Sequence, residues 1–289
     1  MTSFFSLSPR FASVVVAFLC AVPAFAAEPV DLVNVFLGSD SSAQCSPAAI
    51  QPFGMISPGP FNRPSAPCGY AHRNKTLLGF NHTHLQGTGC GSYGVITLLP
   101  VSSAKALGAT VKSSPEKRAG EPGYFKAELD DEGITAEMTC TKRAAIHRYS
   151  FPEKAKTRRV LLDVSQAILY TGKGEFDGKV AAVGDHALEG YARTTAWGEH
   201  KTWFYMEFNK PFRLDAKEGK GAILDFPKED KTPLLVKLGI SYVSEKMPAR
   251  ICRRRSPGGI STPCARMRVG SGTRNSRSSR LKAGRLTSG

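Results

Sequence analysis

Two histidines two residues apart form the most chemically suggestive pair in this sequence: His82 and His84 flank Thr83. On a β-strand, side chains at positions i and i+2 point to the same face, so the two imidazoles could share a ligand or a metal ion. Acidic residues would normally complete a metal site, but no Asp or Glu occurs between Asp40 and Glu116. We therefore predict a hydrogen-bonding pair beside a polar ligand rather than a metal centre.

The glycine-rich stretch G-C-G-S-Y-G at 89–94 fits the dinucleotide-binding pattern G-x-G-x-x-G. Such a site requires a strand before the glycines and a helix after them. Here the strand-like apolar run comes afterwards, at 95–99, and no helix pattern follows. The glycines are therefore predicted to form a tight turn, because only glycine adopts positive φ without steric cost.

The acidic residues of the body cluster in turns, for example at 130–132 and 229–230, which is typical of solvated surfaces. Hydrolysis of a glycosidic bond needs two carboxylates placed on either side of the bond, and no such pair stands out. Trp197 and Trp203 could stack on a sugar ring, although a tryptophan in a β-rich domain more often packs in the core.

The net charge of +15 is unevenly distributed along the 289 residues. Residues 251–289 carry ten basic side chains and no acid, which leaves the rest of the chain with a net charge of +5. No apolar stretch reaches the 18 or so residues of a membrane span. With 41% hydrophobic residues the chain can bury a sizeable core, and neither a nucleic-acid partner nor a membrane span is predicted for the body.

The N-terminus has the pattern of a secretory signal over residues 1–26. Arg10 precedes a short apolar run that ends in the small-x-small sequence Ala24-Phe25-Ala26, after which signal peptidase cuts. We therefore expect a periplasmic or extracellular protein. In that oxidising compartment the four body cysteines, Cys45, Cys68, Cys90 and Cys140, allow three disulfide pairings, and their spacing does not choose among them.

Residues 31–94 are rich in Gly, Pro and Ser and predict loops or short strands. Beyond them, short runs of alternating or apolar residues recur between turn signals, the rhythm of a β-sandwich or barrel. The strands are predicted at 95–99, 124–129, 134–141, 144–151, 160–164, 179–183, 188–192, 202–208 and 234–243.

Three segments resemble the N-terminal domain of glycoside hydrolase family 92, secreted calcium-dependent exo-α-mannosidases. The first is V-N-V-F-L-G at 33–38, similar to the family's V-N-P-F-I-G. The second is Q-P-F-G-M at 51–55 with Ser57-Pro58. The third and most specific is G-F-N-H-T-H-L-Q-G-T-G-C-G at 79–91, close to the family's G-F-S-H-T-H-L-S-G-T-G-C-G.

The resemblance implies an all-β fold over residues 27–244, a β-sandwich of the galactose-mutarotase-like or supersandwich type. It implies that this domain packs on a helical (α/α)₆ toroid, absent here, which would carry the acid, the base and the calcium ligands. The domain would lend pocket residues that bind mannose-containing glycans, namely His82, His84, Gly87, Thr88, Gly89 and Cys90. No cofactor, metal ligand or catalytic residue is predicted in this chain, which should be inactive alone, and both histidines are expected to be partly exposed with unpartnered nitrogens. A stand-alone sugar-binding module and a basic-tailed interaction protein are the alternatives.

Residues 245–289 form the predicted tail, which is basic, has no aromatic residue and has too little apolar content to bury a core, so it should be disordered. One interpretation is a basic arm for nucleic acid or an anionic surface. The favoured interpretation is a frameshift, because the neighbouring reading frame permits W-D-F-D-A-V-R-A-D-A at 259–268, which resembles the family's linker helix.

Overall fold

The computed structural model describes residues 29–40, 44–84, 93–168, 174–195 and 198–254. The chain divides into two units, Met1–Val33 and Asn34–Gly289. The described part of the first unit holds one turn of 3₁₀ helix, η1 (Pro29–Leu32), while the predicted signal segment lies outside the described residues. Among the residues that are described, no helix has the length and apolar character needed to cross a lipid bilayer.

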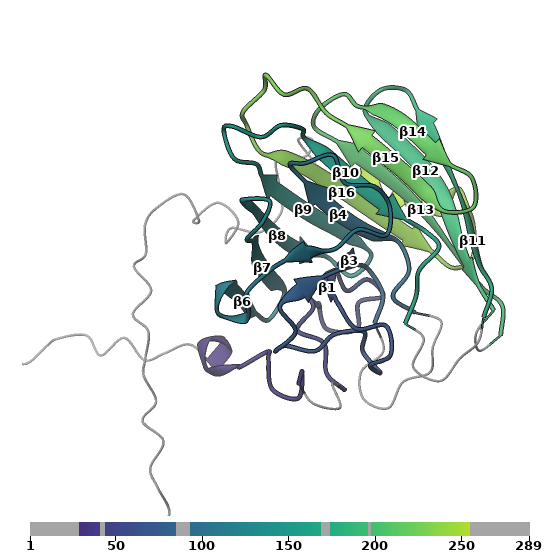
Figure 1. Ribbon diagram of the computed structural model, residues 1–289. Helices are drawn as coiled ribbons and strands as arrows, with labels where there is room; N and C mark the ends of the chain where they lie inside the picture. The colour runs from purple at the N-terminus through teal and green to yellow at the C-terminus, as the bar shows by residue number, and fades with distance from the viewer. Residues whose placement is uncertain (1–28, 41–43, 85–92, 169–173, 196–197, 255–289) are drawn as a thin grey trace, which may run out of the picture. The chain divides into compact units, whose positions relative to one another are not determined.

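The second unit consists largely of antiparallel strands in two large sheets that lie face to face (Figure 1). The smaller sheet has the order β1-β3-β4-β10-β15-β14, with bounds Gly59–Phe61, Gly79–Asn81, Thr97–Val101, Arg159–Asp163, Gly221–Asp225 and Arg213–Lys217. The larger sheet has the order β11-β12-β13-β16-β9-β8-β7-β6, with bounds Phe176–Val183, Ala187–Thr194, His200–Phe208, Leu234–Ser241, Ala144–Ser150, Ile134–Cys140, Tyr124–Leu129 and Arg118–Glu121. A small ribbon pairs β2 (Thr76–Leu77) with β5 (Val111–Lys112), and a 3₁₀ turn, η2 (Pro115–Lys117), precedes β6. The predicted all-β sandwich is confirmed.

The hydrophobic core lies between the two large sheets and follows from the period-two alternation of the strands. In β7, Phe125 and Leu129 are buried while the residues between the inward positions stay half-buried. In β13, Phe204 and Phe208 are buried in the same core. Each such side chain contributes about 1.5–3 kcal/mol of hydrophobic stabilisation, so the two inner faces hold the sandwich together.

All nine predicted strands are present, with ends that differ by a few residues. Most of the strands that the sequence pattern missed are short or lie at an edge, but β15 is a buried strand between β10 and β14 that the pattern also missed. β14 (Arg213–Lys217) is a mostly exposed edge strand, in which charged residues alternate with Leu214 and Ala216 and only Leu214 packs against the core. β1 (Gly59–Phe61) contains Pro60, which lacks the amide proton that strand pairing normally uses.

Trp203 lies on the outer face of the larger sheet, because its neighbours Thr202 and Phe204 face the core. It is half-buried and pairs across the strands with Tyr191. The ammonium of Lys201 lies 3.8 Å from the centre of the Tyr191 ring. The general preference of tryptophan for a core position therefore does not hold at Trp203, and Trp197 lies outside the described residues.

A helix stands at the start of the predicted disordered tail. α2 (Met247–Arg254) packs on β13 and β16, and the side chain of Cys252 is fully buried against Tyr205. Gly239 permits this close approach, because a Cβ there would lie 2.7 Å from the carbonyl oxygen of Pro248. The ammonium of the buried Lys237 donates a hydrogen bond to the carbonyl of Cys252. The expectation of disorder from residue 245 onward is wrong for this helix, while residues 255–289 lie outside the described residues.

Three of the four body cysteines are described, and Cys45, Cys68 and Cys140 are present as thiols. The thiol of Cys140 donates to the carbonyl of Ala49 over 3.1 Å. Burial raises the pKa of the Cys68 thiol to about 11, which keeps it protonated at neutral pH. Cys90 lies outside the described residues, so the disulfide pairing stays a prediction.

Candidate functional site

The His-Thr-His segment leaves the end of β3 and forms one side of a loop stem. The chain returns at Tyr93, and the two sides are joined by side-chain hydrogen bonds. The amide of Asn81 donates to the carbonyl of Gly94 over 3.2 Å, and the hydroxyl of Thr83 accepts from the Gly94 amide over 3.0 Å. Asn81 and Thr83 thus fix the separation at which the loop leaves and re-enters the sandwich.

The returning side of the stem has an unusual backbone. Gly94 has φ of +83°, and a Cβ there would lie 2.6 Å from Cγ1 of Ile168, so the position requires glycine. Ile96 has φ of +62° although it is β-branched, a conformation that costs about 1–3 kcal/mol. This strain is stored in the fully buried entry to β4 and must be offset by neighbouring contacts.

His82 supplies one of those contacts. Its ring is fully buried, and Nδ1 lies 2.5 Å from the carbonyl oxygen of Ile96. Its Nε2 lies 2.9 Å from Nε2 of His147 on β9. The expectation that His82 is exposed with unpartnered nitrogens is therefore wrong: it fastens the strained backbone of Ile96 and links the loop stem to the opposite sheet.

The proton positions in this buried row of hydrogen-bonded side chains can be assigned from donor and acceptor chemistry. A carbonyl only accepts, so Nδ1 of His82 carries a proton and its Nε2 accepts from Nε2–H of His147. Nδ1 of His147 then accepts from the hydroxyl of Tyr149, 2.9 Å away. Burial lowers the pKa of His82 to about 4 and lowers the pKa of His147 well below its ordinary value. His82 and His147 are therefore neutral at physiological pH, and their role is structural.

His84 differs from His82 because one of its nitrogens has no partner. Nδ1 lies 2.9 Å from the carbonyl oxygen of Ser57 and 3.2 Å from the Ser57 hydroxyl, which fixes the ring. Nε2 is shielded from solvent and has no hydrogen-bond partner among the described residues. Burial lowers the pKa of His84 to about 4, so Nε2 is an unprotonated acceptor at neutral pH. Nε2 of the half-buried His84 is therefore a hydrogen-bond acceptor without a partner among the described residues.

The remaining predicted site residues, Gly87, Thr88, Gly89 and Cys90, lie outside the described residues. Within the described ranges, no three His, Cys, Asp or Glu side chains converge as a metal site would require. Calcium also prefers oxygen ligands, which the His82–His147 pair does not provide. The described residues therefore do not fit a calcium ion.

Sequence reasoning missed the partners that hold the histidines. His147 and Tyr149 occupy inward-facing positions of β9, so a histidine at a core position of a predicted strand was a usable signal. The pairing with His82 spans 65 residues, and only the facing of the two sheets brings the rings together. Ile96 acts through its backbone carbonyl and leaves no mark in the sequence, whereas Ser57 belongs to the second family segment and contacts His84 through both its carbonyl and its hydroxyl.

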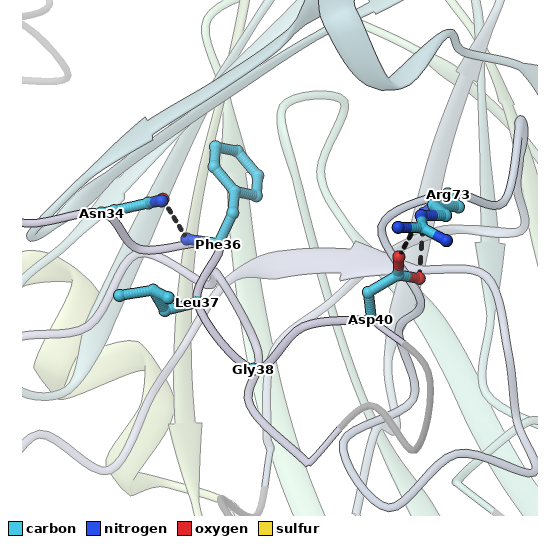
Figure 2. Close-up of a pocket in the computed structure, with 6 residues that line it drawn as sticks. All are labelled: Asn34, Phe36, Leu37, Gly38, Asp40 and Arg73. Atoms are coloured by element: carbon cyan, nitrogen blue, oxygen red, sulfur yellow. Dashed lines mark hydrogen bonds and ion pairs between the residues drawn. The ribbon is translucent and has the colours of Figure 1, made fainter. Parts of the chain in front are cut away.

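A separate surface pocket of about 450 Å³ is drawn in Figure 2. Its lining consists of Asn34, Phe36, Leu37, Gly38, Asp40 and Arg73. Asp40 and Arg73 form an ion pair of 2.7 Å, although they are 33 positions apart in the sequence. The sequence pattern did not predict this pairing, because two exposed charged residues in loops have no periodicity.

The sequence profile of the Glycosyl hydrolase family 92 N-terminal domain matches residues 32–241. The chain belongs to this family. Among solved family members, an α-mannosidase from Bacteroides thetaiotaomicron is 25% identical with a TM-score of 0.69, over 76% of this chain and 34% of that chain. An inverting mannosidase of family GH92 from Bacteroides thetaiotaomicron VPI-5482 shares the fold at 18% identity with a TM-score of 0.65, over 81% of this chain and 34% of that chain.

An uncharacterised secreted glycosidase from Arthroderma benhamiae is 30% identical over an alignment of 131 residues, which covers 42% of this chain and 17% of that protein. The family 92 chain described here thus spans about a third of the solved mannosidases and a smaller share of the secreted glycosidase.

Proposed function

We propose that this chain is the carbohydrate-recognition domain of an α-mannosidase-type glycoside hydrolase. In this proposal its 82–91 loop contributes to a pocket for mannose-containing glycans, and a helical (α/α)₆ domain supplies the catalytic machinery. The proposal is supported by membership of family 92 and by the 25% identical α-mannosidase, whose structure has also been determined with mannoimidazole.

The observation that carries the proposal is the unpartnered Nε2 of His84. A buried polar atom without a partner costs about 1–3 kcal/mol. Five side-chain atoms of the described residues are in this state, and Nε2 of His84 is the one that belongs to a predicted site residue. Ser57 holds the ring through Nδ1, which leaves Nε2 as an acceptor within the 79–91 motif, the most specific of the three family segments. A sugar hydroxyl is a donor of the matching kind. His82 acts as a positioning residue, because it fastens the stem from which His84 emerges.

The catalytic acid and base are assigned to the helical domain because the buried carboxylates of the sandwich already form hydrogen bonds and ion pairs with neighbouring side chains. Glu137 accepts from the guanidinium of Arg148 and from the Tyr124 hydroxyl. Glu132 accepts from two serines and pairs with Lys105 at 2.8 Å. Hydrolysis of a mannoside needs a carboxylic acid to protonate the leaving group and a second carboxylate on the other face of the ring. The sandwich alone should therefore bind sugar without cleaving it.

The calcium ion that the family resemblance implies is likewise proposed to bind in the helical domain. We further propose that the protein is exported to the periplasm or the extracellular space, which is supported by the N-terminal pattern and by the secreted relative. No nucleic-acid partner is proposed.

The binding test is an NMR titration of the full chain with methyl α-D-mannopyranoside. We expect saturable shifts with a millimolar dissociation constant, and a loss of at least about tenfold in His84→Ala, the effect of one hydrogen bond to a buried acceptor. His186→Ala is the matched control, since His186 lies at an exposed turn with half of its side chain accessible. Equal binding by wild type and His84→Ala would refute the role of His84, and no binding by wild type would refute the proposal.

The activity test measures mannose released from aryl and natural α-mannosides by the full chain with calcium present. The expected rate equals that of a buffer blank. Calcium-dependent release above the blank would show that the acid and base lie in this chain and would overturn their assignment to a helical domain.

A further inference from the structure

The pocket in Figure 2 has one polar and one apolar side. Phe36 and Leu37 lie on one side, and the Asp40–Arg73 ion pair lies on the other. A volume of about 450 Å³ falls within the usual range of small-molecule sites, roughly 300–1,000 Å³. The pocket can therefore hold a ligand with both an apolar face and polar edges.

The ion pair has unused hydrogen-bonding capacity. Nε of Arg73 lies 2.7 Å from Oδ2 of Asp40, and the Arg73 amide donates weakly to Oδ1 over 3.4 Å. A guanidinium has five N–H donors and a carboxylate about four acceptor positions, so most of both remain for a ligand. The side chains are 90% and 33% exposed, respectively. Because the pair has no net charge, it suits a neutral ligand whose adjacent hydroxyls donate to Asp40 and accept from Arg73.

The apolar side offers a surface for the C–H face of such a ligand. The side chain of Leu37 is 72% exposed, so it is available to contact a ligand in the pocket. The ring of Phe36 packs on His72 with a centroid distance of 4.5 Å, which fixes its orientation. Asn34 accepts from the Phe36 amide over 3.0 Å and holds the turn that presents both residues.

The pocket wall is anchored to the sandwich by a buried polar network. The amide of His72 donates to the carbonyl of Ser39 over 2.8 Å, which joins the two loops. Nδ1 of His72 accepts from the hydroxyl of Tyr70, which in turn accepts from the buried guanidinium of Arg118. Arg118 also donates to the carbonyl of His72 over 3.0 Å. A site held in this way is preorganised, so a ligand loses little free energy in ordering it.

We propose that this pocket binds a neutral pyranoside, with Asp40 and Arg73 holding two adjacent ring hydroxyls and Leu37 packing against the C–H face of the ring. The inference deepens the proposed function and rests on it, since it assigns further glycan-binding residues to the same domain. It does not require the 82–91 loop.

The test titrates the full chain with methyl α-D-mannopyranoside and, separately, with inorganic sulfate, and follows chemical shifts of Leu37 and Arg73. Asp40→Asn and Arg73→Gln should each weaken binding of the mannoside about tenfold or more, because each removes charge-assisted hydrogen bonds. Asp215→Asn is the matched control, since Asp215 forms an exposed ion pair with Lys217 on the edge strand β14. Sulfate should not bind. Arg73→Gln changes a side chain that is mostly exposed, so it tests the pocket even if Asp40→Asn does not fold.

The outcomes separate this inference from the proposed function. If Asp40→Asn and Arg73→Gln bind like wild type while His84→Ala is weakened, the pocket inference is overturned and the proposed function stands. If the two pocket variants are weakened and His84→Ala is not, the pocket inference stands and the role of His84 fails. Arg73-dependent binding of sulfate would overturn the assignment of a neutral ligand, and failure of wild type to bind any mannoside would overturn both.

Discussion

Acidification should destabilise the sandwich through the buried His82–His147 pair. His82 is neutral in the folded protein, where burial lowers its pKa to about 4 from an ordinary value of 6.5. The unfolded chain therefore binds more protons than the folded protein between these two pH values. Stability is at its full value above pH 6.5 and falls as the pH decreases toward 4. At pH 5 the loss from His82 alone is about 2 kcal/mol, and His147 acts in the same direction.

The assay is equilibrium urea unfolding of the full chain at several pH values between 7.5 and 5. His82→Asn keeps an amide donor for the carbonyl of Ile96 and removes the titrating group, so it should reduce the slope of unfolding free energy against pH by about 1.2 kcal/mol per pH unit near pH 5.5. His186→Asn, at an exposed turn, should leave the slope unchanged. A wild-type stability that is flat across this range, or an unaltered slope in His82→Asn, would refute the burial argument.

Three further changes test the packing. Gly239→Ala should lower the free energy of unfolding by about 2 kcal/mol, because the added Cβ would lie 3.1 Å from the sulfur of Cys252. It should also expose the Cys252 thiol to alkylation, and full protection of the thiol would contradict the packing of α2. Ending the chain after Ser244 should lower Tm by about 4 °C or more because α2 is lost, whereas ending it after Arg254 should change Tm by less than about 2 °C; equal midpoints would show that α2 adds no stability. Arg118→Lys should cost about 3 kcal/mol in urea unfolding, since an ammonium cannot reproduce the forked donation to several oxygens, and a loss below about 1 kcal/mol would contradict this.

Local sequence pattern predicted the strands well because each strand of an antiparallel sandwich has its own inward and outward face. The hairpin of β7 and β8 is an example: the alternation around Phe125 and Met138 gives both strands and the turn between them. The pattern failed where a neighbour distant in sequence decides the outcome. α2 lies in a basic segment of low apolar content, and it is ordered because Gly239 leaves room for Cys252 on the sheet.

In the candidate site, too, the local sequence located the segment, but neighbours distant in the sequence decide what each residue does. The 79–91 motif located the loop, but the sequence could not distinguish the roles of His82 and His84, which are two positions apart. One ring is enclosed by an opposite strand and the other is not, and this difference arises from the facing of two sheets. The Asp40–Arg73 pocket was missed for a related reason, since its two loops meet only in the folded chain.

The closed stem of the 82–91 loop suits this protein to experiments in which the loop sequence is replaced. Asn81, Thr83, Gly94 and Ile96 close the stem with side-chain and backbone hydrogen bonds that use no atom of residues 85–92. The sandwich can therefore carry inserts of different length and composition between these fixed ends, provided that Gly94 and His82 are kept. If residues 85–92 bind glycans as proposed, a combinatorial library at these positions would vary that binding while Asn81, Thr83, Gly94 and Ile96 keep the stem closed.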